Sequence, residues 1–180
     1  MKKIEIEIPE GKEVQWVGDT LKLVDIKKSI TERIKTFEDA CNELGEDNVL
    51  VQAYRTAEFN TSGNQNDVSD VIAYLKLRII VAALNEGWKP QFTKDEYRYF
   101  PWFYFYTKEE YDKIGKKEKG RCVLCSGFST SSNNGFVYVG ANCDSSYSNS
   151  NSGSRLAFRT RELAKYAGKQ FIDIYADYLV

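Results

Sequence analysis

Cysteines carry the most reactive chemistry in this chain, and two of them have the spacing of a metal or redox site. Cys122 and Cys125 form a CxxC pair, while Cys143 and Cys41 lie farther away. A structural zinc ion needs four thiolate or imidazole ligands, but the chain has no histidine and no second CxxC pair. Residues three apart in a strand also point to opposite faces. We therefore expect buried structural cysteines, with a metal or redox site as the alternative, and predict no metal and no cofactor.

Five basic side chains form a short segment, here called the basic strip, near the C-terminus. Basic groups of this kind neutralise phosphates in nucleic-acid-binding proteins. The net charge of the chain is −1, however, and two aspartates continue the same helical row. The sequence therefore favours a solvated face and disfavours nucleic acid as a partner, and weak nucleic-acid association through residues 155–169 is kept as an alternative. The members of the strip are Arg155, Arg159, Arg161, Lys165 and Lys169.

A long uncharged segment precedes the basic strip. From Cys122 to Ser154 the only acidic or basic side chain is Asp144. Residues 127–154 are mostly Ser, Thr, Asn and Gly, which form turns and local backbone hydrogen bonds. This composition is typical either of a hairpin with long turns or of an adaptable recognition surface for a neutral ligand such as a glycan. The second interpretation predicts a glycan or small-ligand site made of Tyr138, Asn142, Tyr147, Asn149 and Arg155.

The chain shows no recognisable catalytic arrangement. The chain has no histidine, which is the commonest general base in enzymes. It also has no GxxxxGK[ST] motif that could bind a phosphate. Neighbouring carboxylates such as Glu109 and Glu110 lie in a charged stretch without the surroundings of a general acid or base. The sequence therefore predicts a protein that is not an enzyme and has no catalytic residues.

An aromatic block consists of Trp88 and the dense aromatic side chains between residues 97 and 106. The stretch "YRYFPWFYFYT" places them on both faces of a predicted strand, and Pro101 indicates a sheet edge or a β-bulge. Aromatic residues supply much of the buried area of protein cores, although a row of them can also bind bases or sugars. We expect a structural role in the core or a subunit interface, with Trp102 buried.

Alternation and helical periodicity predict the elements of the first half. A strand "KKIEIEI" and two strands around residues 18–20 predict a hairpin or small meander over residues 2–25. One helix is expected over residues 31–45, ended by Gly45, and a second begins after Asp47 or Asn48. A third helix capped by Asp67 follows, with a central second half. Its predicted buried stripe is Val68, Val71, Ile72, Leu75 and Ile79.

The second half is predicted to be richer in strands. Residues 121–128 and 135–141 predict a hairpin, and an exposed loop is expected from Asp144 to Gly153. Residues 154–160 predict a further strand, with Leu156 and Phe158 inward and Arg155 and Ala157 outward. A closing helix capped by Thr160 completes the chain.

Strands and helices are segregated along the chain, which predicts the α+β class. We expect a mainly antiparallel sheet with segregated helices, divided into an N-terminal β-hairpin module at residues 1–28 and an α+β domain at residues 29–180. The chain opens without a signal peptide and has no apolar run that could span a membrane. The sequence therefore predicts a cytoplasmic protein that does not associate with membranes.

Three long blocks of the sequence carry a resemblance. They are "RIKTFEDACNELG", "LRIIVAALNEGWKPQFTKDEYRYFPWFYFYTKEE" and "GSRLAFRTRELAKYAGKQFIDIY". These blocks resemble an uncharacterised family of small proteins met in prophage-like and mobile-element regions of gut anaerobe genomes. The resemblance covers residues from about Thr31 onward and implies a phage or prophage origin, with no catalytic residues to carry over. We expect a phage-derived accessory or binding protein with a protein partner or as a homo-oligomer, and virion association is an alternative location.

Overall fold

The fold combines helices with two small antiparallel sheets, which confirms the predicted α+β class. One sheet has the strand order β1-β2, and the other has the order β3-β5-β4. The computed structural model describes residues 7–26, 28–62, 68–91, 93–126, 133–144 and 154–179.

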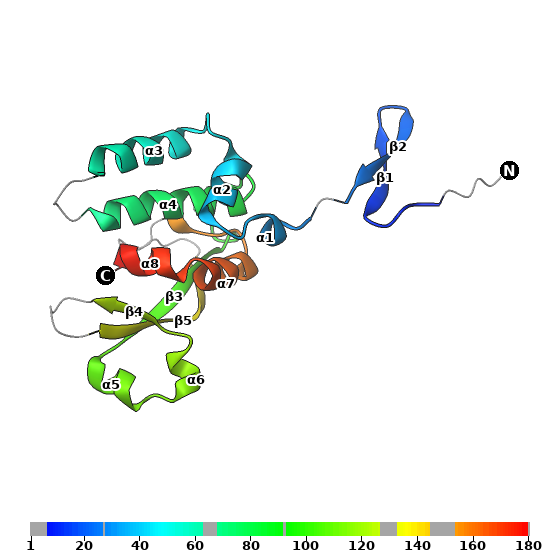
Figure 1. Ribbon diagram of the computed structural model, residues 1–180. Helices are drawn as coiled ribbons and strands as arrows, with labels where there is room; N and C mark the ends of the chain where they lie inside the picture. Colours follow the sequence, from blue (N-terminus) through cyan, green and yellow to red (C-terminus); the bar gives the residue numbers. More distant parts are fainter. Residues whose placement is uncertain are drawn as a thin grey trace.

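The predicted N-terminal hairpin is present as β1 (Lys12–Val17) and β2 (Thr20–Asp25). Gly18 turns the chain with φ 62°, a backbone conformation that glycine adopts without strain. None of the residues 7–26 is buried, and Figure 1 shows the hairpin standing apart from the other elements. Most of the predicted strand "KKIEIEI" lies outside the described residues.

The helix expected over residues 31–45 is divided into α1 (Ile30–Arg33) and α2 (Phe37–Leu44), so the prediction of one helix was wrong. Asp39 causes the restart, because its carboxylate accepts the backbone N–H groups of Lys35 and Thr36 at 2.9 and 2.8 Å. Gly45 ends α2 with φ 85°, as predicted. The break also frees the Ile34 carbonyl, which accepts the Tyr166 hydroxyl at 2.5 Å.

The next two helices, α3 (Val49–Thr61) and α4 (Ser69–Leu84), agree with the sequence in their extent. Asn48 caps α3 by accepting the Leu50 N–H at 2.9 Å, while Asp67 lies outside the described residues. The buried stripe predicted for α4 was wrong at Val71, which is 50% exposed. The apolar second half of α4 is central as predicted, because α2, α3 and α8 all pack against this helix. Its fully buried members are Leu77, Ile79, Ile80 and Leu84.

The three-stranded sheet contains β3 (Arg98–Tyr106), β4 (Val123–Ser126) and β5 (Asn133–Asp144), with β5 in the middle. The edge position of β3 and the register shift between Trp102 and Phe103 agree with the signal given by Pro101. The expected burial of the aromatic block was wrong in part, since Trp102 is 54% exposed and Tyr104 45%. The adjacent Phe105 is also 43% exposed, so the exposed aromatics of β3 do not follow a strict alternation.

Two short charged helices, α5 (Lys108–Lys113) and α6 (Lys116–Lys119), follow β3 and bury none of their residues. Tyr111 of α5 nevertheless lies against Gly135 of β5. A Cβ atom at Gly135 would come within 2.5 Å of the Tyr111 ring, so the glycine allows α5 to approach the sheet.

The strand predicted for residues 154–160 is instead a 3₁₀ helix, η1 (Ser154–Leu156), followed by one β-bridge between Phe158 and Tyr99. Leu156 and Phe158 point inward as predicted. The prediction that Ala157 faces outward was wrong, since Ala157 is 1% exposed. The tight turn of η1 breaks the alternation of a strand. In addition, the Ala157 carbonyl accepts a hydrogen bond from Asn85 at the C-terminus of α4.

The closing helix starts after its predicted cap, since the Thr160 hydroxyl accepts the Leu163 N–H at 3.2 Å. The prediction of one continuous helix was wrong, because the helix is divided into α7 (Arg161–Gln170) and α8 (Ile172–Leu179). The division lies at Phe171, a buried residue with φ −118° and ψ 30°. This change of direction lets α7 pack on β3 and β5 while α8 packs mainly on α4.

The core lies where α7 and α8 are placed between α4 and the sheet (Figure 1). Phe103 of β3 stacks on Phe136 of β5 at 4.7 Å between ring centroids and contacts Tyr175 of α8 at 4.8 Å. The sheet and the helices therefore share one aromatic core. No helix among the described residues is long and apolar enough to cross a membrane.

Candidate functional site

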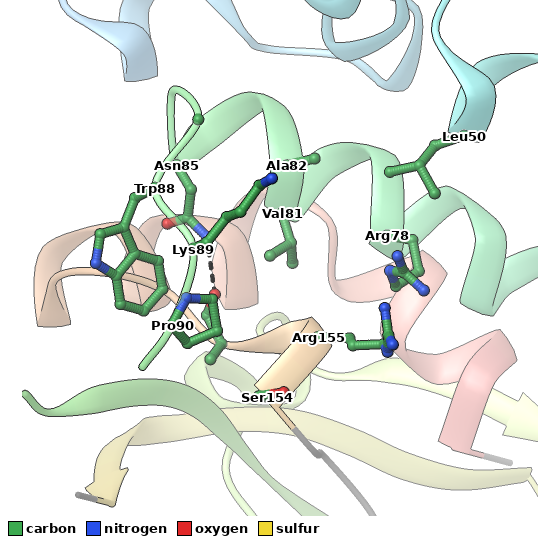
Figure 2. A pocket seen from close by; sticks show the side chains of 12 residues that line it. Leu50, Arg78, Val81, Ala82, Asn85, Trp88, Lys89, Pro90, Ser154 and Arg155 are labelled. Carbon is green, nitrogen blue, oxygen red and sulfur yellow. Dashed lines mark hydrogen bonds between the residues drawn. The ribbon is translucent and has the colours of Figure 1, made fainter. Parts of the chain in front are cut away.

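A cavity of about 410 Å³, here called the α4 pocket, lies between the second half of α4, the segment that follows it and η1 (Figure 2). Small-ligand sites have volumes of about 300–1,000 Å³. The walls combine apolar and cationic side chains and contain no Asp or Glu. The lining residues are Leu50, Arg78, Val81, Ala82, Asn85, Gly87, Trp88, Lys89, Pro90, Ser154, Arg155 and Ala157.

Asn85 joins the two walls of the α4 pocket at the end of α4. Its side chain is buried, its Nδ2 donates to the Ala157 carbonyl at 2.8 Å, and its Oδ1 accepts the Arg159 backbone N–H at 3.0 Å. Two backbone groups that are covered by protein thus receive their hydrogen bonds from one side chain. The pair of bonds fixes η1 beside α4.

The residues after Asn85 turn the chain away from α4 through a left-handed backbone. Glu86 has φ 48° and Gly87 has φ 84°. This conformation is costly for a glutamate, but the Glu86 carboxylate forms ion pairs with Arg33 at 2.8 Å and with Arg159 at 2.5 Å. These contacts hold the turn in place, so that Trp88 and the residues after it form the rim of the pocket.

Three cationic side chains converge on the α4 pocket. Arg78 comes from α4, Lys89 from the segment after it and Arg155 from η1. Figure 2 shows the guanidinium groups of Arg78 and Arg155 facing each other at one end of the cavity. The ion pairs found in the described parts of the chain are formed by Lys12, Arg33, Arg55 and Arg159, and not by these three cations. Arg78 instead lies over the ring of Tyr74, 5.8 Å from its centroid, and donates a long hydrogen bond to the Tyr74 hydroxyl at 3.4 Å.

Facing guanidinium groups without an acid are suited to hold an oxyanion. Each guanidinium presents a planar fork of N–H donors that matches a phosphate or a carboxylate. Without an anion, the two positive charges repel each other, and solvent at the exposed Arg155 screens part of this repulsion. An anion between Arg78 and Arg155 would remove this repulsion and satisfy both forks.

The residues predicted from the sequence as a glycan or small-ligand site are only partly described. Tyr147 and Asn149 lie outside the described residues. Tyr138 is a buried residue of β5, and desolvation raises the pKa of its hydroxyl. Asn142 is exposed on β5, where its side chain accepts the Cys143 N–H at 2.9 Å. Arg155 is the member of this set that lines the α4 pocket.

Sequence reasoning missed Arg78 and Lys89 as site residues, and it named Trp88 only as a member of the aromatic block that could bind bases or sugars. Arg78 interrupts an otherwise apolar half of α4, and "WKP" directly follows the glycine at which the helical pattern ends. Both features are visible in the sequence. Their proximity to Arg155 is not, because it depends on the long-range hydrogen bonds of Asn85.

The cysteines occupy different environments. Cys41 is fully buried in α2, and desolvation raises the pKa of its thiol to about 11, which agrees with a structural role. Cys122 and Cys143 are only half-buried, contrary to the expectation, and the Cys122 thiol donates to the Glu118 carbonyl at 3.3 Å. The side chain of Cys125 lies outside the described residues. Among the residues that are described, no three cysteine or acidic side chains gather as metal ligands.

Most cations of the basic strip with a described contact serve the protein itself. Arg159 pairs with Glu86, and Arg161 donates to the Ala141 carbonyl at 2.7 Å. Lys169 lies 5.8 Å from the ring centroid of Tyr138. These contacts tie η1 and α7 to their neighbours, and among the members of the strip it is Arg155 that contributes to the cavity.

Comparisons of the chain with protein-family models, with curated proteins and with solved structures gave no match.

Proposed function

We propose that this chain is a non-enzymatic, phage-derived accessory protein that binds a small anionic ligand in the α4 pocket. The observation that carries the proposal is the convergence of Arg78, Lys89 and Arg155 on a cavity whose lining contains no acid. Exposed cations on protein surfaces are usually interspersed with acids. Three cations in one concave, partly apolar site therefore favour an anion as their partner.

The burial of Arg78 strengthens this interpretation. Arg78 is half-buried, so part of its hydration is lost on folding without compensation by a carboxylate. The contact with the Tyr74 ring compensates a little of this loss. A bound oxyanion would supply the missing charge and hydrogen bonds, which makes the site more favourable with a ligand than without one.

The other functions considered from the sequence stay predictions. The glycan hypothesis depends on the composition of residues 127–154, most of which lie outside the described residues. Nucleic-acid association through the basic strip is less favoured, because Arg159 and Arg161 are engaged within the protein. We further propose a protein partner or a homo-oligomer, with a cytoplasmic location or virion association.

Inorganic phosphate is the probe that tests anion binding. We expect phosphate at low ionic strength to raise the melting temperature of the protein, because a ligand that binds only the folded state stabilises it by RT ln(1 + [L]/Kd). Arg155→Ala should weaken phosphate binding about tenfold, the effect of losing one charge-assisted hydrogen bond of about 1.5 kcal/mol. Raising the salt concentration should weaken binding further.

Lys165→Ala is the matched control for this experiment. Lys165 is an exposed cation of α7 that does not line the cavity, so its removal changes the net charge equally and leaves the pocket intact. Equal loss of phosphate binding in both variants, or no stabilisation by phosphate in the unmodified protein, would contradict the proposal.

A further inference from the structure

Trp88 provides the α4 pocket with a flat apolar surface. The indole lies at the end of the cavity opposite the guanidinium groups of Arg78 and Arg155 (Figure 2). Its backbone N–H donates to the Asn85 carbonyl at 3.0 Å, so the residue is fixed by the same turn that shapes the pocket. Trp88 is half-buried, and over the described part of the chain no ring stacks on its indole.

The wall between the two ends is apolar. Val81 and Ala82 of α4 and Leu50 of α3 contribute aliphatic side chains, and Pro90 adds a ring beside Trp88. Lys89 also lies on the Trp88 side of the cavity (Figure 2), so this part suits a largely uncharged body with one anionic group within reach of Lys89. The pocket thus offers a cationic end, an apolar middle and an aromatic end.

We infer that the ligand of the α4 pocket is a nucleotide, with its phosphate between Arg78 and Arg155 and its base against Trp88. This inference rests on the anion-binding role proposed above and adds the aromatic part of the ligand. A phosphate monoester carries a charge of about −1.5 to −2 at neutral pH, which Arg78 and Arg155 balance, and Lys89 offers a third cation for a second phosphate. Bases stack on aromatic side chains without sequence preference, because every base has a π-face.

The fluorescence of Trp88 tests the inference directly. The chain has three tryptophans, and the other two, Trp16 and Trp102, are exposed by 70% and 54%. Replacing both with phenylalanine leaves Trp88 as the single indole without disturbing the core. We expect adenosine monophosphate to quench this emission in a saturable way and to bind at least about tenfold more tightly than inorganic phosphate, the contribution of one stacked base.

Two variants separate the contributions of the ends. In the unmodified background, Trp88→Leu keeps an apolar side chain and should lower the affinity for adenosine monophosphate about tenfold while leaving phosphate affinity unchanged. Arg155→Ala should lower the affinity for both ligands, and Lys165→Ala should change neither affinity. Circular dichroism spectra and melting curves of each variant establish that it is folded.

The outcomes distinguish this inference from the function on which it rests. If phosphate binds and Arg155→Ala weakens it, but adenosine monophosphate binds no more tightly than phosphate, anion binding stands and the nucleotide inference is wrong. If Trp88→Leu weakens phosphate and nucleotide equally, the indole acts through the shape of the pocket and the inference is also wrong. If neither ligand binds, both proposals fail.

Discussion

At the scale of single residues, Asn85 shapes the α4 pocket through its hydrogen bonds to the backbone. Its side-chain amide donates one hydrogen bond to Ala157 and accepts one from Arg159, both in the segment that lies beside α4. A hydrophobic residue of similar size could fill the same space, but it would leave a carbonyl and an N–H without partners away from water. Asn85 is therefore a positioning residue for the pocket.

Asn85→Ala should lower the free energy of unfolding by about 2–3 kcal/mol, because it removes two hydrogen bonds and leaves their backbone partners unsatisfied. Urea denaturation measures the change. Asn42→Ala is the control, since Asn42 is exposed in α2 and its replacement should alter stability by less than about 0.5 kcal/mol. Equal stability of the two variants would show that Ala157 and Arg159 do not depend on Asn85.

At the scale of elements, the approach of α7 to the sheet depends on Gly168. A Cβ atom at this position would lie 2.6 Å from the Cβ atom of Pro101 and 2.6 Å from the Tyr138 ring. The glycine therefore allows the helix to lie directly on β3 and β5. Glycine inside a helix normally costs about 1 kcal/mol relative to alanine, and close packing compensates this cost here.

Gly168→Ala should therefore destabilise the protein, by about 1–3 kcal/mol as for other overpacked sites, although helix propensity alone predicts the opposite sign. Thermal or urea denaturation gives the sign directly. Gly140→Ala in β5 is a suitable comparison, because no atom lies within 4 Å of its added Cβ, and we expect it to be nearly neutral. Stabilisation by Gly168→Ala would mean that α7 is not in close contact with the sheet.

Local signals in the sequence were sufficient to predict many of these elements. Asn48, Thr160 and Gly45 mark helix ends in the sequence and do so in the structure. The break before α2 was missed, although Asp39 acts locally, because the periodicity of residues 31–45 continues across it. The strand predicted at residues 154–160 was wrong because Asn85, about 70 residues earlier, holds this segment in another conformation.

The candidate site was less predictable than the fold for the same reason. Arg155 was among the predicted ligand-binding residues, but its expected companions were neighbours in the sequence. The cavity that Arg155 lines is shared with Arg78 and Trp88, which belong to a helix and a turn far upstream. Composition of a segment can indicate that a residue is available for binding, whereas the identity of the other site residues depends on tertiary contacts.

At the scale of the whole molecule, the N-terminal hairpin is the part least connected to the core. Val14 pairs with Leu23 and Trp16 with Leu21 across the strands, yet Trp16 is 70% exposed. An isolated two-stranded hairpin has little stability of its own in water. We therefore predict that the hairpin contributes little to the stability of residues 29–180.

Removal of residues 1–28 should leave the free energy of unfolding within about 0.5 kcal/mol of the value for the unmodified protein. A longer truncation that removes residues 1–36 should cost about 2–5 kcal/mol, because it takes away Ile30 and Ile34, which are 8% and 0% exposed. Urea denaturation of both truncated proteins makes the comparison. A large loss in the shorter truncation would show that the hairpin packs on the rest of the chain.

The hydrogen bonds of Asn85 span 72 and 74 residues, and this separation has a consequence for biosynthesis. Helices α2, α3 and α4 leave the ribosome well before residues 154–159, and closing so long a segment is an entropically costly step. The wall formed by η1 can dock on α4 only after Arg159 has been translated. A nascent chain therefore leaves the α4 side of this contact uncovered while residues 85–159 are synthesised, and it acquires the α4 pocket in one late step.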